Sequence, residues 1–398
     1  MRLGGKLFTV FIGLLLSSTG AVIVCSFTPS QSDSHRDTLT LPSPLQLVFP
    51  AYFGHHYSIP GDNPETKQGF ELGRMLFYEK SLSANNTVSC ASCHQQLHAF
   101  SDTVAFSRGI DGARQPRNTM ALINLLWVRQ FFWDGRVTGL ENQVDTPMIN
   151  LHEMGQSFAA SIQKLQAKED YSEKFRAAFG DKKITKDRIE KALAQFERAL
   201  ISGNAKYDQY LQGQYKPTHS ELEGIRLFYG GPTKATYARR PSCSHCHGGP
   251  KTYEELFMNN GLDSIIQDAG RAAITAMAYD NGRFRVVTLR NIALTAPYMH
   301  DGRFKTLAEV LDHYSDHIHN SPTLSPFLKT PNVESDPRHL SFTQQEKEDL
   351  LAFLNMLTDS SFVTDPRFSN PFISSTTSYN QKTINSSQHS TQILKNNL

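Results

Sequence analysis

The chain has 398 residues, enough for two ordinary domains with appendages. Hydrophobic residues make up 39% and charged residues 20% of it, which is the composition of a globular protein and excludes a polytopic membrane protein. The formal net charge is +2, and both surplus charges are Arg2 and Lys6, so the rest of the chain is formally neutral. Nucleic-acid binding requires a basic surface for phosphates and is therefore not expected.

Residues 1–20 have the layout of a secretory signal peptide. Arg2 and Lys6 precede an apolar stretch that ends in small residues. We therefore expect an exported, periplasmic protein. The apolar character continues to residue 27, so the alternative is a membrane anchor at the N-terminus or a lipid on Cys25. Soluble export is the preferred interpretation, and no other contact with a membrane is expected.

Four of the five cysteines lie in two copies of one short pattern. The sequence C-x-x-C-H occurs as Cys90-Ala-Ser-Cys93-His94 and as Cys243-Ser-His-Cys246-His247. It is the attachment sequence of a c-type haem: the two cysteines lie along one turn and bond one porphyrin, and the histidine binds the iron. A Cys₄ zinc site would have its second pair much closer, and a thioredoxin-like motif leaves both histidines unexplained. The pattern predicts two covalently bound haem c groups.

The body of the chain repeats itself once. The sequence G-R-M-L-F-Y at 73–78 returns as G-I-R-L-F-Y at 224–229, and a C-x-x-C-H follows each copy. Further landmarks recur in the same order: Arg117-Asn118 and Arg290-Asn291, Asp134-Gly135-Arg136 and Asp301-Gly302-Arg303, Leu140 and Leu307. A shared order of landmarks around the same cysteine motif indicates internal duplication.

These observations predict a mostly α-helical protein made of two cytochrome c-like haem domains, related by duplication, with long loops. We expect a linker at 21–45, an N-terminal haem domain at 46–214 and a C-terminal haem domain at 215–360. Ser, Thr, Asn and Gln dominate residues 361–398 and cannot bury a core, so we expect a disordered tail there.

Helical periodicity is clearest in two segments. Thr185 can cap one helix, and Thr343 with Glu346 forms a capping box before the other. The apolar faces are Ile189, Leu193, Phe196 and Leu200 in the first helix, and Leu350, Phe353, Leu354 and Leu357 in the second.

A third helix carries a candidate iron ligand. Thr306 and Glu309 form a capping box, and Leu307, Val310, Leu311 and Tyr314 follow on one apolar face. Tyr314 therefore points into the domain. The pattern alone favours an ordinary core aromatic over an iron ligand. Met299, His300 and His313 are the other candidates for the sixth ligand of the haem on His247.

The repeat makes the two halves differ at this position. Alignment of Leu140 with Leu307 places Pro147 opposite Tyr314, and proline has no donor atom. If this position supplies the sixth ligand, one haem is closed and the haem on His94 is open to a small molecule. One open and one closed iron is the arrangement expected of an enzyme rather than of an electron carrier.

At these residues the chain resembles the bacterial di-haem cytochrome c peroxidase family, and within it the MauG-like branch. The resemblance runs from about Leu72 to Leu357. Its segments are Phe77-Tyr78-Glu79, Pro116-Arg117-Asn118, Phe132-Trp133-Asp134-Gly135-Arg136, Glu153-Met154-Gly155 and Leu294-Thr-Ala-Pro-Tyr-Met-His-Asp-Gly-Arg303.

The resemblance implies a role for several residues. Trp133 matches the tryptophan that lies between the two haems and acts as an electron bridge. A buried structural role for Trp133 is compatible with that function. Glu153 matches the distal acid that handles the peroxide proton, although by sequence alone it could equally be a surface acid. Gln143 and Pro147 match the other distal positions. Tyr314 matches the tyrosine ligand of the MauG-like branch, where ordinary peroxidases have methionine.

The resemblance also implies one calcium ion between the domains. Asn118 and the carbonyls of Thr295 and Pro297 match its ligands, and hard oxygen donors suit that ion. Without the resemblance, Asn118 would be read as a turn residue. Met299 falls in the shared loop, so the resemblance assigns it to packing.

Two positions depart from the family pattern. The ordinary peroxidases have a distal histidine that must leave during reductive activation, and Ile110 takes its place here. The N-terminal haem is therefore expected to be open without activation. Pro241 replaces the surface tryptophan that relays electrons in MauG, and Trp127 and Trp133 are the only tryptophans. Maturation of methylamine dehydrogenase is therefore not a safe inference.

The main hypothesis is a cytochrome-c peroxidase-like enzyme that reduces hydrogen peroxide at the N-terminal haem. Electrons would come from a small cytochrome or cupredoxin and pass through the C-terminal haem. The first alternative is MauG-like, peroxide-dependent oxidation of a protein or organic substrate. The second is a non-enzymatic di-haem electron carrier, which Pro147 disfavours.

Overall fold

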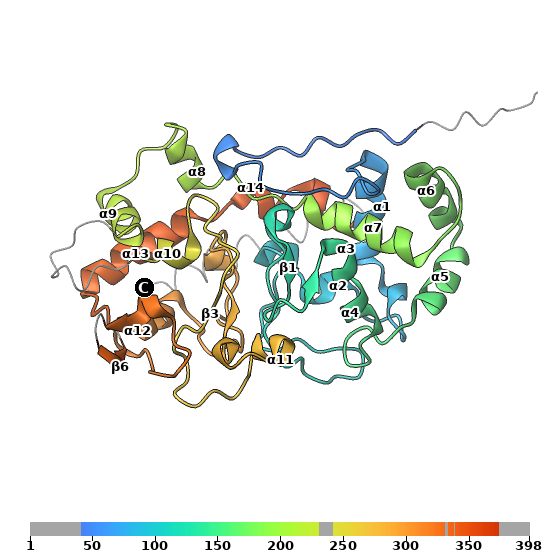
Figure 1. Ribbon diagram of the computed structural model, residues 1–398. Helices are drawn as coiled ribbons and strands as arrows, with labels where there is room; N and C mark the ends of the chain where they lie inside the picture. The colour runs from blue at the N-terminus through green and yellow to red at the C-terminus, as the bar shows by residue number, and fades with distance from the viewer. Residues whose placement is uncertain (1–40, 231–241, 331–332, 338, 374–398) are drawn as a thin grey trace, which may run out of the picture. The chain divides into compact units, whose positions relative to one another are not determined.

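The computed structural model describes residues 41–230, 242–330, 333–337 and 339–373 (Figure 1). The expected signal peptide, nearly all of the expected linker and the tail from residue 374 lie outside these residues, as does Pro241. Within the described residues, no helix is long and apolar enough to cross a membrane.

The described chain is mostly helical, as the sequence predicts. Its longer helices are α1 (Lys67–Tyr78), α5 (Phe158–Gln166), α6 (Glu169–Phe179), α7 (Lys186–Arg198), α9 (His219–Phe228), α12 (Leu307–Asp316) and α13 (Gln344–Met356). The shorter ones are α2 (Cys90–Cys93), α3 (Leu140–Gln143), α4 (Asp145–Ile149), α8 (Lys206–Leu211), α10 (Ser244–His247), α11 (Ala272–Thr275) and α14 (Ser360–Val363).

Strands and 3₁₀ turns fill the loops between these helices. In the described residues the strands form two-stranded antiparallel ladders: β1 (Gln130–Phe131) with β2 (Val137–Thr138), β3 (Phe257–Met258) with β4 (Phe284–Arg285), and β5 (Lys329–Thr330) with β6 (Val333–Pro337). The 3₁₀ turns are η1 (Ala51–Phe53), η2 (Lys80–Leu82), η3 (Gln96–His98), η4 (Leu125–Trp127), η6 (Ala278–Asp280), η7 (Ile292–Leu294), η8 (Pro326–Leu328) and η9 (Pro366–Phe368).

The helix starts that the sequence predicts are confirmed. The Thr185 hydroxyl accepts a hydrogen bond from the Arg188 amide at 3.2 Å, so it caps α7. Capping boxes begin α12 at Thr306 and α13 at Thr343. Each of these caps satisfies amides that a helix leaves unpaired in its first turn.

The N-terminal core forms where α1 crosses α7 at very close range. A Cβ atom added to Gly73 would lie 1.9 Å from the carbonyl oxygen of Ala192, so only glycine fits. Around the crossing, Leu72, Leu76 and Phe196 are fully buried. Close backbone contact therefore brings the apolar faces of the two helices together.

The C-terminal core uses the same device. Here α9 crosses α13, and a Cβ atom on Gly224 would lie 1.9 Å from the carbonyl oxygen of Asp349. Phe228 and Phe353 are buried at this crossing, with ring centroids 4.9 Å apart. Gly73 and Gly224 are the first residues of the sequence repeat, so equivalent positions of the repeat make equivalent contacts.

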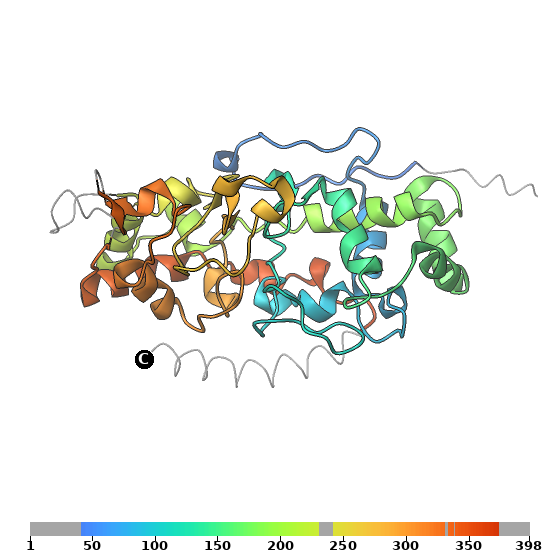
Figure 2. The ribbon, with the colours of Figure 1, turned by 60° about the horizontal axis from the view of Figure 1, so that its bottom comes forward.

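The segment after α13 returns to the N-terminal core. Phe362, Val363 and Phe368 are buried in the same cluster as α1 and α7, and the Tyr78 hydroxyl donates to the Phe368 carbonyl at 2.7 Å. Figure 2 shows this red segment beside the cyan segment that carries α2 and η3. The sequence predicts a disordered tail at residues 361–398, of which the structure describes 361–373. The structure packs this segment as far as Phe368, because these apolar side chains interrupt an otherwise polar segment, whereas Phe372 and Ile373 are exposed.

The tight crossing at Gly73 leads to a stability prediction. Gly73→Ala forces α1 and α7 apart, so we expect the free energy of unfolding to fall by about 1–3 kcal/mol in denaturant titrations. Gly61→Ala is the matched control, because a Cβ atom there has no neighbour within 4 Å. Equal stability of the two variants would contradict the close approach.

Candidate haem and catalytic sites

The first cysteine motif forms a short helix with a fixed histidine at its end. Cys90 and Cys93 begin and end α2, and His94 is its C-cap. The Nδ1 atom of His94 donates to the Phe100 carbonyl at 2.8 Å, which leaves Nε2 as the ring's lone-pair nitrogen. Burial lowers the pKa of His94, so the ring stays neutral. A neutral, oriented imidazole is what a haem iron requires of its proximal ligand.

The second motif repeats this geometry. Cys243 is the N-cap of α10, Cys246 lies within it, and His247 is its last residue. The Nδ1 atom of His247 donates to the Val287 carbonyl at 3.1 Å, and burial lowers the pKa of His247 to about 4. Both histidines are thus held by a backbone carbonyl.

The first motif opens into a cavity of about 740 Å³. The sequence-predicted residues that line it are Cys90, Cys93, His94, Trp133, Gln143, Pro147 and Glu153. Gln143 ends α3 and Pro147 lies in α4, so these helices carry the residues expected to face an incoming small molecule. The structure therefore brings the whole N-terminal set together.

Glu153 lies in the loop after α4 and is partly shielded from solvent. Its amide donates to the Asn150 carbonyl and its carbonyl accepts from the Ile110 amide, both at 2.9 Å, so its backbone is fixed. Burial raises the pKa of Glu153 above its usual range. The side chain of Ile110 packs at Gly155 and does not belong to the cavity lining.

The second motif opens into a cavity of about 270 Å³. The predicted apolar face of α12 lines it in full: Leu307, Val310, Leu311 and Tyr314. Helix α12 supplies Tyr314 to this cavity, and α10 supplies His247. The two elements therefore contribute the candidate ligands of one iron.

Tyr314, Met299 and His300 all line this cavity, whereas the fourth ligand candidate, His313, does not. Asn260 donates through Nδ2 to the Tyr314 hydroxyl at 3.3 Å and to the Met299 sulfur at 3.4 Å. His313 does not line the cavity, because its Nε2 atom bonds the Asn260 carbonyl at 3.0 Å. His300 stacks on Phe284 with ring centroids 3.8 Å apart. Burial raises the pKa of Tyr314 to about 12.

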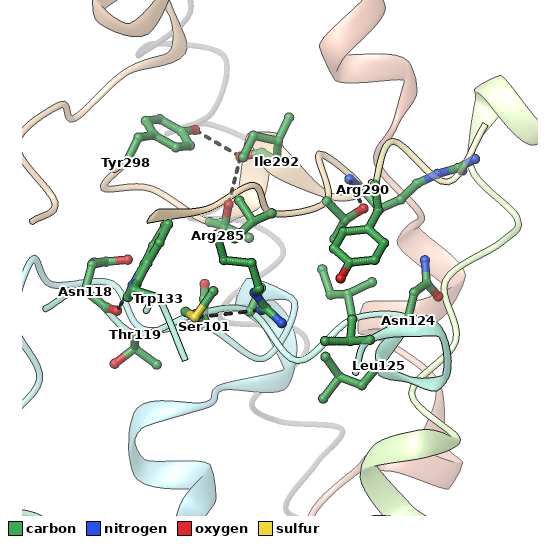
Figure 3. A pocket seen from close by; sticks show the side chains of 18 of the residues that line it. Ser101, Asn118, Thr119, Asn124, Leu125, Trp133, Arg285, Arg290, Ile292 and Tyr298 are labelled. Atoms are coloured by element: carbon green, nitrogen blue, oxygen red, sulfur yellow. Dashed lines mark hydrogen bonds between the residues drawn. The ribbon is translucent and has the colours of Figure 1, made fainter. Parts of the chain in front are cut away.

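Trp133 lines both large cavities and lies between them. Its indole Nε1 donates to the Asn118 carbonyl at 2.8 Å, as Figure 3 shows. The Asn118 amide in turn donates to the His300 carbonyl at 2.7 Å. The backbone of Asn118 thus connects the tryptophan to a loop of the second half.

The predicted calcium residues meet in a third, small cavity of about 70 Å³ (Figure 3). Asn118, Thr295 and Pro297 all line it. Asn118 donates through Nδ2 to the carbonyls of Val104 and Ala105 at 3.2 and 3.1 Å, which leaves its side-chain oxygen as an acceptor. The described part of the chain has no cluster of three or more His, Cys, Asp or Glu residues that could hold a metal ion. The donors at Asn118 are instead amide and backbone oxygens, which suit calcium.

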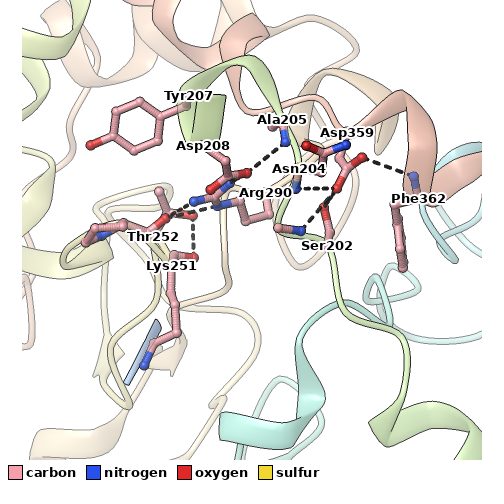
Figure 4. Close-up of polar contacts among 12 residues, drawn as sticks. Ser202, Asn204, Ala205, Tyr207, Asp208, Lys251, Thr252, Arg290, Asp359 and Phe362 are labelled. Atoms are coloured by element: carbon pink, nitrogen blue, oxygen red, sulfur yellow. Dashed lines mark hydrogen bonds and ion pairs between the residues drawn. The ribbon is translucent and has the colours of Figure 1, made fainter. Parts of the chain in front are cut away.

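Buried polar contacts fix the second-half side of this small cavity (Figure 4). Arg290, which lines it, pairs with Asp208 at 2.5 Å, and both side chains are fully buried. The Asp359 carboxylate accepts from the Ser202 hydroxyl at 3.1 Å and from the Asn204 amide at 2.9 Å. Because removal of one partner would leave a buried charge, these contacts hold the segment between the two cores in place.

Comparison with known proteins identifies the family. Residues 67–216 match the sequence profile of the di-haem cytochrome c peroxidases. The methylamine utilization protein MauG of Methylorubrum extorquens is 33% identical over 75% of this chain and 80% of its own. The cytochrome c551 peroxidase of Nitrosomonas europaea is 34% identical over 63% of this chain and 73% of its own.

The chain belongs to the di-haem cytochrome c peroxidase family. A solved MauG-like protein associated with microbial copper homeostasis is 35% identical, with a TM-score of 0.73 over 83% of this chain and 100% of its own. The diheme peroxidase BthA from Burkholderia thailandensis shares the fold at 19% identity and a TM-score of 0.60, over 83% of this chain and 98% of its own. The protein is therefore a peroxidase-type oxidoreductase of a family that carries two haems.

The residues present fit two haems of this family. Each large cavity is lined by the two cysteines and the histidine of its own motif, and apolar atoms form most of its surface. Buried cysteine thiols surrounded by apolar side chains have raised pKa values, as those of Cys90 and Cys243 do. Burial thus keeps these sulfurs protonated. Thioether bonds to a porphyrin leave no sulfur to ionise, so they suit such a site.

Several residues of the site carry no motif that the sequence could reveal. Asp268 holds Arg117 through two hydrogen bonds at 2.7 and 2.8 Å, and the same arginine reaches Asp134 at 2.6 Å. Arg285 is buried and lines all three cavities. Asn260 organises the tyrosine side of the second cavity. No sequence motif marks Arg285, Asp268 or Asn260.

Proposed function

We propose that the protein reduces hydrogen peroxide at the N-terminal haem site with electrons that enter through the C-terminal haem site. The overall reaction is H₂O₂ + 2 H⁺ + 2 e⁻ → 2 H₂O, and the electron donor is a small cytochrome or cupredoxin. The observation that carries this proposal is the difference between the two cavities. One contains Pro147 and an acid, Glu153, and the other contains Tyr314.

The two cavities are lined by different groups. Pro147 has no donor atom, and Ile110 is packed outside the first cavity, so neither competes with peroxide for the iron of the haem on His94. Tyr314 lies in the second cavity with its hydroxyl held by Asn260. This supports an open N-terminal site and a closed C-terminal site with Tyr314 as iron ligand. The non-enzymatic carrier requires two closed sites and is therefore disfavoured.

In the first site, a bound haem supplies the iron chemistry that cleaves the O–O bond. The chain's part is to handle protons. The Glu153 carboxylate would accept one proton from hydrogen peroxide in this cavity and return it to the oxygen that leaves as water. Gln143 lines the same cavity and is a neutral hydrogen-bonding group that orients the peroxide. The raised pKa of Glu153 suits proton transfer in both directions.

Trp133 is proposed as the electron path between the sites. It lines both large cavities, and its hydrogen bond to the Asn118 carbonyl fixes the indole plane. An aromatic ring in this position shortens the distance over which an electron must pass through saturated atoms. A structural role of Trp133 at the junction of the halves is compatible with this electron-transfer role.

The second candidate function is MauG-like, peroxide-dependent oxidation of a protein or organic substrate. Tyr314 favours it, because an anionic oxygen ligand stabilises high oxidation states of iron. The MauG relatives and the MauG-like protein of copper homeostasis are consistent with such chemistry or with a cupredoxin partner. Both functions use the same two sites and differ in what donates the electrons.

Two wider features belong to the same proposal. The equivalent glycines Gly73 and Gly224, each at the tight crossing of two helices, support internal duplication of one haem domain, with the boundary near residue 215. Export to the periplasm, by a signal peptide at residues 1–20 or with an N-terminal anchor, agrees with covalent haem attachment outside the cytoplasm.

We expect Glu153→Gln to lower peroxide turnover with a reduced cytochrome donor by about a hundredfold or more, because the proton acceptor is lost. The wild-type rate should fall as pH decreases through the pKa of Glu153, since the carboxylate is the active form. Burial raises this pKa, so the fall begins at higher pH than for an exposed glutamate. Glu153→Asp should keep this limb of the pH profile. An unchanged rate and profile in Glu153→Gln would contradict the role.

Tyr314→Phe should open the C-terminal site, since phenylalanine has no oxygen for the iron. The expected result is a change in the absorption and electron paramagnetic resonance signals of one ferric haem, with the other unaffected. Tyr298→Phe is the control, because Tyr298 lines the same cavity but donates its hydroxyl to the Ile292 carbonyl. Identical spectra for Tyr314→Phe and wild type would exclude Tyr314 as a ligand.

We also propose that one calcium ion binds Asn118 and the carbonyls of Thr295 and Pro297. Removal of calcium with a chelator should then slow electron passage between the sites, because Trp133 is anchored on the Asn118 carbonyl. Elemental analysis should give one calcium per chain, and added calcium should restore turnover. Protein that contains no calcium as purified and turns over normally in chelator would disprove the site.

A further inference from the structure

A buried carboxylic acid faces the N-terminal haem cavity from the side of α7. Glu197 is only 4% exposed and belongs to the lining of this cavity. One of its carboxyl oxygens, Oε2, has no hydrogen-bond partner. Buried polar atoms without a partner are rare and costly in folded proteins, so this atom requires an explanation.

The C-terminal half shows that the helix crossing does not require an acid here. A Cβ on Gly73 would meet Ala192 and Phe196, and a Cβ on Gly224 would meet Asp349 and Phe353. These equivalences place Glu197, which follows Phe196, opposite Leu354, which follows Phe353. Leu354 is buried and lines the second cavity. The same structural position is therefore leucine in one cavity and glutamic acid in the other.

The cationic neighbour of Glu197 is engaged elsewhere. Arg198, on the same helix, forms ion pairs with Glu65 and Glu141, and Arg198 and Glu65 are both buried. No ion pair joins Glu197 to a cation in the described part of the chain. A carboxylate without a partner in this position is costly, so burial gives the Glu197 carboxylate a high affinity for a proton, and a positive charge on the cofactor opposes this.

The charges around Glu197 act in opposite directions. Burial, the dominant cause, raises its pKa to about 8; the Arg198 charge opposes this and the Glu141 charge on α3 adds to it. The other elements packed against α7, which are α1, α5, α6 and η4, contribute no charge to it. On α2, the nearby Cys90 thiol is the attachment point of the haem, so it no longer titrates once bonded.

We propose that Glu197 is the proton acceptor coupled to electron entry at the N-terminal haem site. An electron from the donor lowers the net positive charge of this site, and the Glu197 carboxylate then binds one proton from solvent to become the neutral acid. Oxidation reverses both steps, so charge stays balanced inside the cavity. The second site lacks this acceptor because Leu354 stands in its place.

The coupling follows from elementary electrostatics. A nearby positive charge stabilises a carboxylate, and loss of that charge raises the affinity of the carboxylate for a proton. By linkage, the electron affinity of the site must then depend on pH between the pKa values of Glu197 in the oxidised and reduced states. The inference needs only a haem in the first cavity, which family membership supports, and it does not depend on peroxide as the substrate.

The experiment measures the reduction potentials of the two haems as a function of pH, by spectroelectrochemistry of the holoprotein without peroxide. For wild type, we expect the reduction equilibrium of the N-terminal haem to change up to tenfold per pH unit in a window near pH 8, about 59 mV for a one-electron couple. The potential of the C-terminal haem should change little there. In Glu197→Gln and Glu197→Leu, the pH dependence of the N-terminal haem should disappear.

Glu65→Gln is the matched control. Glu65 also has a buried carboxyl group, which forms an ion pair with Arg198, but it is not part of the cavity lining. It should retain the wild-type pH dependence. Redox-difference infrared spectra give a second readout: the carbonyl stretch of a protonated carboxylic acid should appear on reduction in wild type and Glu65→Gln, and be absent in Glu197→Gln. A pH dependence that survives in both Glu197 variants, or disappears in Glu65→Gln, would overturn the proposal.

Failure of this inference and failure of the proposed peroxidase function have different signatures. A pH-independent potential in wild type, with normal peroxide turnover, would reject only the role of Glu197. A pH-dependent potential that requires Glu197, without peroxide turnover, would reject the peroxidase function and keep the proton acceptor. The two sets of measurements share no readout.

Discussion

Close approach of two helix backbones at a single glycine shapes each half of this protein. At Gly73 and at Gly224 a methyl group would collide with a backbone carbonyl, so the two helices of each pair meet at contact distance. The helix face that emerges beside each contact then lines a haem cavity, with Glu197 in the first half and Leu354 in the second. The crossing therefore determines which side chains can reach the cofactor, and the cofactor completes a core that side chains alone leave open.

Local signals in the sequence predict most of this scaffold. The cysteine motifs, the capping boxes at Thr306 and Thr343 and the apolar face that ends at Tyr314 all depend on residues within a few turns, where spacing determines geometry. Contacts between distant segments are harder to foresee. Asp268 and Asn260 reach partners far along the chain through side chains that carry no pattern of their own.

The segment after α13 shows the same limit of prediction from sequence. Average polarity predicts a disordered tail, but Phe362 and Phe368 lie in the N-terminal core with the rings of Phe100 and Phe196 around them. A few large apolar side chains outweigh a polar composition when they reach a preformed surface, because each buries a large apolar area. Composition over a long window cannot detect them.

The halves share their architecture and differ in the polar groups that face each cofactor. Between them, Trp133 is tied to the Asn118 carbonyl, and the Asn118 amide is tied to the His300 carbonyl of the second half. Arg117, next in sequence, spans the same junction to Asp268. Any shift of Asn118 thus moves the indole relative to both cavities. The proposed ion binding, the proposed electron passage and the joining of the halves therefore all depend on one short segment of backbone. This explains why the segment is held by hydrogen bonds on both sides rather than by apolar packing alone.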